Sequence, residues 1–443
     1  MKNQILIPLI VLFFIGEFSY SQKILTLKEA ISIALSQNTN LIKSFNSLSP
    51  QETSIKTAYG NFLPNLNVGG SWGWQRISDN GGKQLNYFGE EQSIPQSQVD
   101  SRNWSLSANG NVTLFDGLSN YANLKQKKNN YESAKLDFEK LKQDIIYQTA
   151  NLYFSVISYD KLLKYQEENY SYNLSLLDKT REMNELKMVT ISDVYSQEVQ
   201  TANSESALLQ SQNNFEKAKI SLLNYLSLDI NMDYAFNSPE DLNSDKDYSE
   251  ETFEKLLGIA LANRKDFQSQ QLVVESSNEQ LTIARSDYLP NLSGSFRFST
   301  NSIIPDALFE RRTYGLGLSL NFPIFSRWST DYSVEMAQVQ IKNSNEDLNN
   351  LIRSIKSDVK NVMLDLLTAK KQVEVTGKAI QSAQENWRIK KESYEIGRVT
   401  YIDLQQSYRD LLQAQNNSVQ SLYNYYTTNY QLMNKLGILE MQK

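Results

Sequence analysis

Four short segments of the chain alternate between apolar and polar residues, which is the period-2 pattern of a half-buried β-strand. The apolar positions are Leu66, Val68, Gly70, Trp72 and Trp74; Trp104, Leu106, Ala108, Gly110, Val112 and Leu114; Leu292, Gly294, Phe296 and Phe298; and Tyr314, Leu316, Leu318, Leu320, Phe322 and Ile324. Each segment has roughly 9–13 residues, the length of a tilted strand that crosses a bilayer. The pattern predicts two β-hairpins, at about 66–115 and 292–325.

The opposite face of each predicted strand carries mostly Ser, Asn and Gly. A soluble sheet with one buried face is one interpretation, and a membrane barrel with a water-filled lumen is the other. The uncharged polar face favours the barrel, as do aromatic residues near strand ends at Trp72, Trp74, Trp104 and Tyr314. Four strands are too few to close a barrel, because small closed barrels need about eight strands. Unpaired edges facing lipid are costly, so a barrel requires two, three or four copies of the chain. Polar loops, at about 77–102 and 301–312, are expected to face outward.

Elsewhere the apolar period is seven, which is typical of coiled-coil helices. One series comprises Tyr131, Phe138, Ile145, Leu152 and Tyr159, and a second runs from Ile352 through Val359 and Leu366 to Tyr394. They predict helices at about 118–185 and 328–395, each on the order of 100 Å long at 1.5 Å per residue. Shorter helices are predicted at about 27–62, 192–226, 253–289 and 402–436. The combined length of two short helices equals that of one long helix, so two short helices stacked end to end can run beside each long one. In the second half, helix 402–436 is expected to stack on helix 27–62.

The chain also repeats itself, which is the strongest single guide to its architecture. Leu63-Pro64-Asn65-Leu66 returns as Leu289-Pro290-Asn291-Leu292 after 226 positions, and Val189-Thr190 with Asp193 returns as Val399-Thr400 with Asp403 after 210 positions. We therefore expect a first repeat at 22–230 and a second at 253–443, each with Pro64 or Pro290 at the joint between helix and strand. The acidic segment 231–252 is expected to be a linker, either a solvated loop or a contact for a partner.

Composition narrows the possible functions. The net charge is −6 with no basic stripe, which argues against nucleic-acid binding, and there is no Cys or His. The sequence therefore offers no thiolate or imidazole metal site, no cofactor motif and no nucleophile–base pair of an enzyme. Residues 1–21 have the charge, apolar run and small residues of an export signal. With no Cys near the cleavage point, no lipid anchor is expected, and no other stretch approaches the ~20 apolar residues of a membrane-spanning helix.

Duplicated helical hairpins with duplicated β-hairpins resemble the TolC-like outer-membrane efflux protein family over nearly the whole mature chain. The residues that carry the resemblance are the two Leu-Pro-Asn joints, Phe115-Asp116-Gly117, and Tyr394-Glu395-Ile396-Gly397 leading to Val399-Thr400 and Asp403. The resemblance implies an α+β membrane protein: each chain has four transmembrane strands and long coiled-coil hairpins. A homotrimer would form a 12-strand barrel in outer-membrane lipid and a periplasmic helical tunnel. It also implies a passive exit duct for tripartite efflux or type I secretion, with a periplasmic adaptor and a proton- or ATP-driven inner-membrane pump as partners.

By the same resemblance, the helical tips at 185–193 and 395–403 face the pump. Val189, Thr190, Gly397, Val399 and Thr400 would dock the adaptor, and Asp193, Asp403, Gln406 and Tyr394 would form a constriction. The chain departs from the family pattern where Gln406 replaces a second ring carboxylate and Val399 replaces a tip Arg, which implies a weaker ring and a less ionic latch.

Two alternatives stay open at this point. Asp193 and Asp403 also fit helix capping or a first-turn acid. A coiled-coil stalk or surface adhesion protein with a membrane anchor is the alternative function, although a stalk does not need duplicated β-hairpins with polar faces. Lys187 occupies the place of Gly397 in the first repeat, so the two tips are expected to differ, with only the second forming the family's turn.

Overall fold

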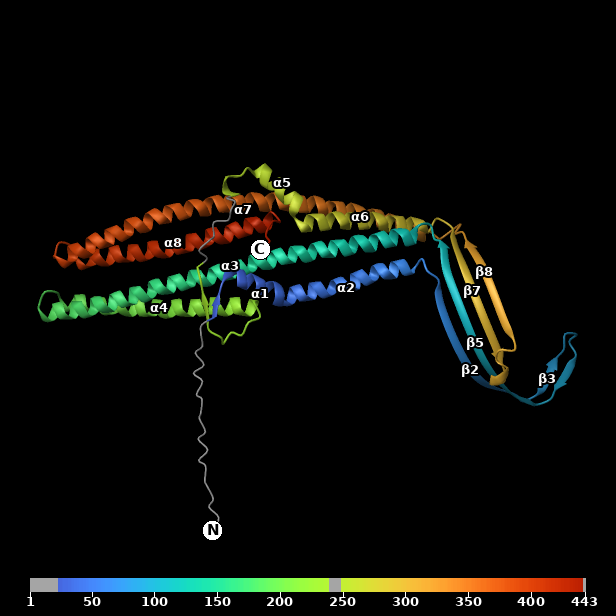
Figure 1. Ribbon diagram of the computed structural model, residues 1–443. Coiled ribbons are helices and arrows are strands. Elements are labelled where there is room, and N and C mark those ends of the chain that lie inside the picture. Colours follow the sequence, from blue (N-terminus) through green and yellow to red (C-terminus); the bar gives the residue numbers. More distant parts are fainter. Residues whose placement is uncertain (1–22, 239–247, 441–443) are drawn as a thin grey trace, which may run out of the picture.

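The computed structural model describes residues 23–238 and 248–440, so the predicted export signal at 1–21 lies outside the described residues. The molecule is a long bundle of helices with a sheet at one end (Figure 1). Two helices of 67 residues, α3 (Ser119–Glu185) and α7 (Ser329–Glu395), run the whole way from the sheet to the far tips. They return as α4 (Ile191–Tyr225) and α8 (Tyr401–Lys435). All four agree with the predicted ranges to within one residue.

The two helices predicted before the strands are each broken in two, which corrects the sequence-based expectation. The segment 27–62 forms α1 (Leu27–Gln37) and α2 (Thr39–Gly60), and 253–289 forms α5 (Phe253–Asn263) and α6 (Lys265–Ser286). The single residues between them, Asn38 and Arg264, have extended backbones with φ −63° and ψ near 120°. Oδ1 of Asn38 accepts the N–H groups of Asn40 and Leu41 at 3.0 and 3.2 Å, so it starts a new helix.

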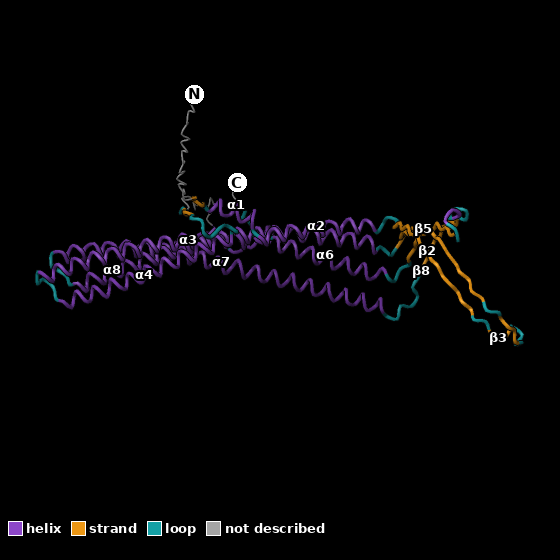
Figure 2. The backbone as a smooth tube through the Cα atoms, turned by 90° about the horizontal axis from the view of Figure 1, so that it is seen from below, coloured by secondary structure: helices purple, strands orange, loops and turns teal. Residues whose placement is uncertain are grey.

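The short helices stack within each repeat, so the expected stacking of 402–436 on 27–62 is wrong. Gly437, just after α8, packs so closely on Arg264 that a Cβ there would lie 2.8 Å from the Arg264 nitrogen. Leu432 and Leu436 share a buried cluster with Leu256 of α5. The end of α4 instead meets α1 and α2 in the other cluster, through Leu222, Leu223, Leu226, Leu27, Ala30 and Leu41. Figures 1 and 2 show the resulting rows of helices.

The sheet contains four antiparallel strands in the order β2 (Asn65–Asp79), β5 (Ser97–Phe115), β7 (Asn291–Ser302) and β8 (Arg312–Asn321). The two predicted hairpins therefore join through β5 and β7. Pro64 and Pro290 directly precede β2 and β7, which confirms the two helix-to-strand joints. The second connection holds a short 3₁₀ turn at Pro305–Ala307.

The first connection is more ordered than the predicted polar loop at 77–102. Strands β2 and β5 continue into it as a ribbon, pairing as far as Asp79 with Ser97, and a small hairpin follows, made of β3 (Gly82–Leu85) and β4 (Glu91–Ile94). Arg76 donates to both carboxylate oxygens of Asp100 at 2.7 and 2.9 Å across this ribbon. The repeat spacing falls from 226 to 210 positions across this hairpin, so the first repeat is 16 residues longer here. These residues extend a two-stranded ribbon beyond β7 and β8 (Figure 1).

A second, parallel sheet of two strands lies at mid-length, where β1 (Lys23–Leu25) pairs with β6 (Tyr234–Phe236). The predicted linker at 231–252 therefore contributes a strand and, at Tyr248–Glu250, a 3₁₀ turn, while its residues 239–247 lie outside the described residues. The buried hydroxyl of Tyr153 on α3 donates to the carbonyls of Leu25 and Asn237 at 2.8 and 2.9 Å. Among the described residues, no helix is long and apolar enough to cross a membrane.

Candidate functional site

The four-stranded sheet gathers the predicted apolar positions on one face. Its register puts Leu66, Gly110, Phe296 and Leu316 in one row across the strands, and Val68, Ala108, Phe298 and Tyr314 in the next. Polar rows lie between them, such as Asn67, Asn109, Arg297 and Gly315. Because side chains alternate faces along a strand, these rows separate an apolar face from a Ser- and Asn-rich face.

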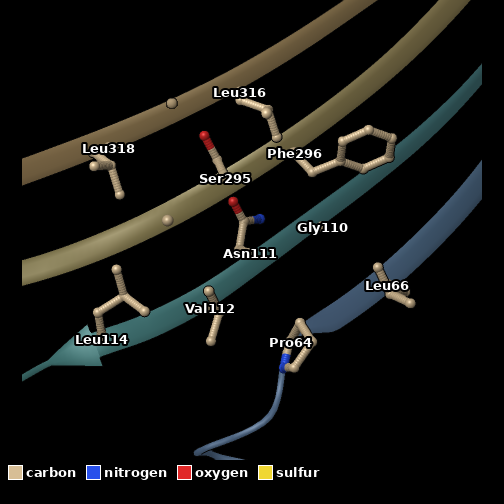
Figure 3. Close-up of a pocket in the computed structure, with 12 residues that line it drawn as sticks. Pro64, Leu66, Gly110, Asn111, Val112, Leu114, Ser295, Phe296, Leu316 and Leu318 are labelled. Atoms are coloured by element: carbon tan, nitrogen blue, oxygen red, sulfur yellow. The ribbon is translucent and has the colours of Figure 1, made fainter.

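The apolar face is open in the single chain. Leu316 is 87% exposed, and Leu66, Val68, Leu318 and Leu320 are similarly uncovered. A hollow of about 670 Å³ lies across all four strands near the helix joint (Figure 3), and Leu66, Val112, Leu114, Phe296, Leu316 and Leu318 contribute to its lining. The outer edges of β2 and β8 pair with no other strand in the described part of the chain. The sheet therefore has both an uncovered face and two free edges.

At the opposite end, the two tips form the same turn, which corrects the expectation that they differ. Lys187 and Gly397 both adopt left-handed backbone, with φ 59° and 71°. In each tip the next residue closes the helix with a 2.8 Å bond, from the Met188 N–H to the Met183 carbonyl or from the Arg398 N–H to the Ser393 carbonyl. This is a Schellman motif in both cases. Lys187 therefore adopts the glycine conformation at a steric cost.

The residues after each turn form a capping box. The Asp193 N–H donates to Thr190 Oγ1 at 3.3 Å, and Asp193 Oδ2 accepts from the Thr190 N–H and hydroxyl at 2.9 and 2.7 Å. Thr400 and Asp403 repeat the arrangement, with distances of 3.2, 3.2 and 2.7 Å. The hydrogen bonds from Thr400 lower the pKa of Asp403 below its ordinary value. The capping role that the sequence left open is therefore present at both tips, and the carboxylate ring stays a prediction.

The other predicted constriction residues lie on the second hairpin. Gln406 is held along α8, donating to Asp410 at 2.8 Å and accepting from Arg409 at 2.9 Å. The ring of Tyr394 lies 6.4 Å from that of Tyr401. Burial raises the pKa of Tyr394, and the negative charge of Asp193 raises it further.

A buried polar cluster behind the tips was not predicted. Its members are Asn173 on α3, Gln197 and Thr201 on α4, and Tyr401 and Gln405 on α8. The Gln405 side-chain N–H donates to Gln197 Oε1 at 3.0 Å, and the Tyr401 hydroxyl donates to the same oxygen. The sequence signalled this cluster only weakly, through polar residues that lie within the predicted helices α3, α4 and α8. Contact between α4 and α8, more than 200 positions apart, became visible only with the fold.

No group of three or more acidic side chains in the described part of the chain is placed to hold a metal ion. The candidate site therefore consists of three surfaces: the apolar face of the sheet, its polar face and the helical tips. The three surfaces lie at the two ends of the molecule, with the sheet at one end and the helical tips at the other (Figure 1).

Comparison with known proteins agrees with this architecture. The family model described as outer membrane efflux protein matches residues 30–227 and 256–438. The chain is 22% identical to outer membrane protein TolC of Salmonella enteritidis over 451 residues, covering 100% of this chain and 88% of that protein. It is 21% identical over 450 residues to the Escherichia coli (strain K12) protein of the same name, covering 99% of this chain and 87% of that protein.

Solved structures show the same fold. The CusC structure superposes with a TM-score of 0.79 at 16% identity, covering 93% of this chain and 92% of that chain. The outer-membrane channel OprN gives a TM-score of 0.78 at 15% identity, covering 93% and 89%. The chain belongs to the outer membrane efflux protein family, which confirms the resemblance seen in the sequence. Its role is that of an outer-membrane exit duct of efflux systems.

Proposed function

We propose that three copies of this chain close into one duct, with a 12-strand barrel in the outer membrane and a helical tunnel through the periplasm. The observation that carries the proposal is the pair of free sheet edges at β2 and β8. An open edge facing lipid leaves backbone groups unpaired at several kcal/mol each, so the edges need partners. A second copy offers the complementary edge, and repeated addition of the same contact closes a ring.

The contact between the two repeats indicates what the contact between subunits looks like. Within the chain, α3 meets α6 through Lys125 and Glu279 at 2.6 Å, and β5 pairs with β7. In the second repeat α7 and β8 correspond to α3 and β5, and in the first repeat α2 and β2 correspond to α6 and β7. These four elements therefore carry the surfaces that would meet between subunits. On α7 the equivalents of Gln126 and Asn129, which bond to α6, are Met336 and Val339, and both are exposed. Exposure of equivalent apolar positions supports α7 of one subunit packing on α2 of the next.

Strand register makes this proposal sharply testable. Asn109 of β5 lies opposite Arg297 of β7. In the second repeat the position equivalent to Asn109 is Ser319, 210 positions later, and in the first repeat the position equivalent to Arg297 is Ser71, 226 positions earlier. If the contact between subunits repeats the contact between β5 and β7, Ser319 of one subunit lies opposite Ser71 of the next. The chain has no Cys, so Ser71→Cys/Ser319→Cys introduces the only thiols.

Mild oxidation of membranes containing this double variant is expected to give covalent dimers and trimers on a non-reducing gel. The matched control is Gln75→Cys/Ser319→Cys, which moves one thiol four residues along β2, or about 13 Å. Crosslinking of the control in place of the first pair would overturn the register. A detergent-extracted particle with the mass of one 50.8 kDa chain and intact strands would overturn the assembly.

The duct is proposed to be passive. Its apolar face and the hollow of Figure 3 fit lipid hydrocarbon, while the Ser- and Asn-rich face would line the lumen. The tips at 185–193 and 395–403 are proposed to meet a periplasmic adaptor and an inner-membrane pump, with Gly397, Val399 and Thr400 in the contact. Asp403 from three subunits is proposed to form an anionic ring at the constriction, which favours cations.

The ring and the capping box can be separated experimentally. Asp403→Asn keeps a side chain that can cap the helix and removes the charge, whereas Thr400→Val keeps the charge and removes the cap. In planar bilayers, Asp403→Asn is expected to lower cation selectivity, and Thr400→Val is expected to retain it. Unchanged selectivity in Asp403→Asn would exclude the ring while leaving the duct itself intact.

A further inference from the structure

The apolar face of the sheet ends in arginines at the end of the sheet that lies away from the helices (Figure 1). Each arginine is exposed and lies two positions further out than an aromatic residue on the same face: Arg76 beyond Trp74 on β2, Arg102 beyond Trp104 on β5 and Arg312 beyond Tyr314 on β8. Near the helix joint this face carries Leu66, Leu292 and Leu320 instead. Positive charge is therefore concentrated at one end of an otherwise apolar face.

Strand length places these arginines at one border of the apolar band. Arg76 follows Leu66 by ten positions in β2, which is roughly 33 Å along a strand at about 3.3 Å per residue. At a tilt of about 45° the strand rises about 23 Å over this distance, close to the ~25 Å height of a lipid-facing band. The rings of Trp72 and Trp104, with centroids 6.0 Å apart, lie just inside this border, where interfacial aromatic residues occur.

Two of the three arginines have no carboxylate partner. Arg76 donates to Asp100 at 2.7 and 2.9 Å, and its guanidinium carbon lies 5.4 Å from the centre of the Trp74 ring. In the described part of the chain no carboxylate lies within ion-pair distance of Arg102 or Arg312, and Arg312 Nε donates to the Phe309 carbonyl at 2.8 Å. Three arginines and one aspartate give this border a net charge of +2 per chain.

The proposed contact between subunits continues this basic border around the barrel. With Ser319 opposite Ser71, Arg312 falls opposite Ser78 of the next subunit and diagonally beside Arg76 of that subunit, at about 7–8 Å between Cα atoms. Arg102 is two strands and four residues away from Arg312, on the order of 16 Å, both within one chain and across the contact. Because arginine side chains are long, one headgroup with two phosphate groups can meet two of these arginines.

We propose that Arg102 and Arg312, with Arg76 beside them, bind lipids of the outer leaflet whose headgroups carry more than one phosphate group. The site rests on the proposed function, in which the apolar face meets lipid and the helices lie on the periplasmic side. A guanidinium group forms two parallel hydrogen bonds to a phosphate, and basic residues at a membrane border attract anionic headgroups. Lipids held in this way fix the depth of the barrel in the membrane.

The decisive experiment measures lipid binding to the detergent-extracted assembly. Wild type and Arg102→Gln/Arg312→Gln are titrated with a glycolipid whose headgroup carries two phosphate groups, and bound lipid is counted by native mass spectrometry. Each arginine near a lipid surface contributes a factor of about five, so the double variant is expected to bind about 25-fold more weakly. Unchanged affinity would overturn the site.

The matched control is Arg297→Gln, which removes the same charge from the opposite face of the sheet. Arg297 is exposed on β7 and shares its row with Asn67, Asn109 and Gly315. Its affinity for the glycolipid is expected to equal that of wild type. A loss equal to that of the double variant would show that only the total charge matters, and would overturn the assignment to the lipid-facing border. Arg102→Lys/Arg312→Lys keeps the charge and is expected to keep most of the binding.

Further lipids define the headgroup. Phosphatidylglycerol, with one phosphate, is expected to bind more weakly than the glycolipid, and the double variant is expected to lose this preference. Wild-type binding of phosphatidylglycerol as tight as that of the glycolipid would overturn the requirement for more than one phosphate. Inorganic phosphate at the same phosphate concentration is expected to leave the glycolipid bound, because it brings no acyl chains to the apolar face. Complete displacement would overturn the lipid assignment.

The oligomer band separates the two proposals. A wild-type protein without a trimer, or without crosslinking of Ser71→Cys/Ser319→Cys, would overturn the proposed duct. An intact trimer whose glycolipid binding is unaffected by the double variant would overturn the lipid site alone. If the double variant fails to assemble, Arg102→Gln decides, because this change breaks no ion pair in the described part of the chain. Affinity equal to wild type in that variant overturns the site.

Discussion

The two repeats place left-handed backbone at the same four positions but fill them with different residues. The first repeat has Gly117, Leu118, Lys187 and Ser227, and the second has Arg327, Trp328, Gly397 and Gly437 at positions 210 further on. Each repeat therefore uses glycine at some turns and a residue with a side chain at the others. The backbone conformation is preserved while the residue changes, so conformation alone does not explain where glycine occurs.

The surroundings of each turn explain the difference. A Cβ on Gly117 would lie 2.8 Å from the Ser286 carbonyl oxygen and 2.9 Å from Leu289 Cβ, and one on Gly437 would lie 2.8 Å from the Arg264 nitrogen. At Gly397 nothing lies within 4 Å. Glycine is therefore required where another segment packs against the turn, whereas at the open tip it only relieves backbone strain.

The largest expected effect is at the joint between the repeats. Gly117→Val adds a side chain both in the left-handed region and against the Ser286 backbone, so we expect a loss of about 3 kcal/mol of folding free energy. Denaturant titration of the detergent-extracted protein measures it. Arg327→Gly, the same position in the second repeat, is expected to change stability by about 1 kcal/mol or less. Equal losses in the two variants would contradict the packing explanation.

An intermediate effect is expected at the tips. Lys187→Gly removes left-handed strain from a side-chain-bearing residue and is expected to stabilise the first tip by about 1 kcal/mol. Gly397→Lys is expected to destabilise the second tip by about the same amount, since open space surrounds Gly397 and only the backbone penalty applies. Hydrogen exchange of the amides around each turn reports both changes. A tip that became less protected in Lys187→Gly would show that the lysine side chain contributes a contact of its own.

The smallest effect concerns pH at the second tip. The pKa of Asp403 is lowered from 3.8 by its bonds to Thr400, so capping adds stability above that value and loses it as the pH falls through the folded-state pKa. Thr400→Val is therefore expected to lower tip protection at pH 7, and its difference from wild type is expected to shrink as the pH falls through the folded-state pKa of Asp403, leaving only the bond from the Asp403 N–H to Thr400 Oγ1. Amide exchange of residues 401–404 against pH measures it. A constant difference down to acid pH would mean that the threonine acts without the carboxylate.

Much of this architecture could be predicted from local patterns. Heptad spacing and the turn residues fixed α3, α4, α7 and α8 to within one residue, because an unbroken apolar seam has few alternative conformations. Strand alternation identified the apolar face. The repeat located both Leu-Pro-Asn joints, since proline restricts the residue before it.

Other features depend on contacts that no local pattern reveals. Asn38 interrupts an otherwise helical segment because its side chain caps a new helix, and Arg264 interrupts the equivalent segment while pairing with Asp266 at 2.6 Å and Asp358 at 3.4 Å. The same applies to the stacking of α8 on α6 and to the bonds of Gln197. The ribbon at 77–102 was missed because pairing between β2 and β5 continues through polar residues once its register is set.

The bundle contains two kinds of helical row, one continuous and one made of two helices stacked end to end. Helices α3 and α7 are continuous shafts from sheet to tip, while the rows made of α4 with α2 and of α8 with α6 are jointed midway. Two helices stacked end to end resist being pushed together, but they transmit little rotation to each other because no continuous helical backbone connects them. We therefore expect rotation at the tips to be absorbed at mid-length, so that the sheet receives only the torque delivered by the two continuous helices of the chain.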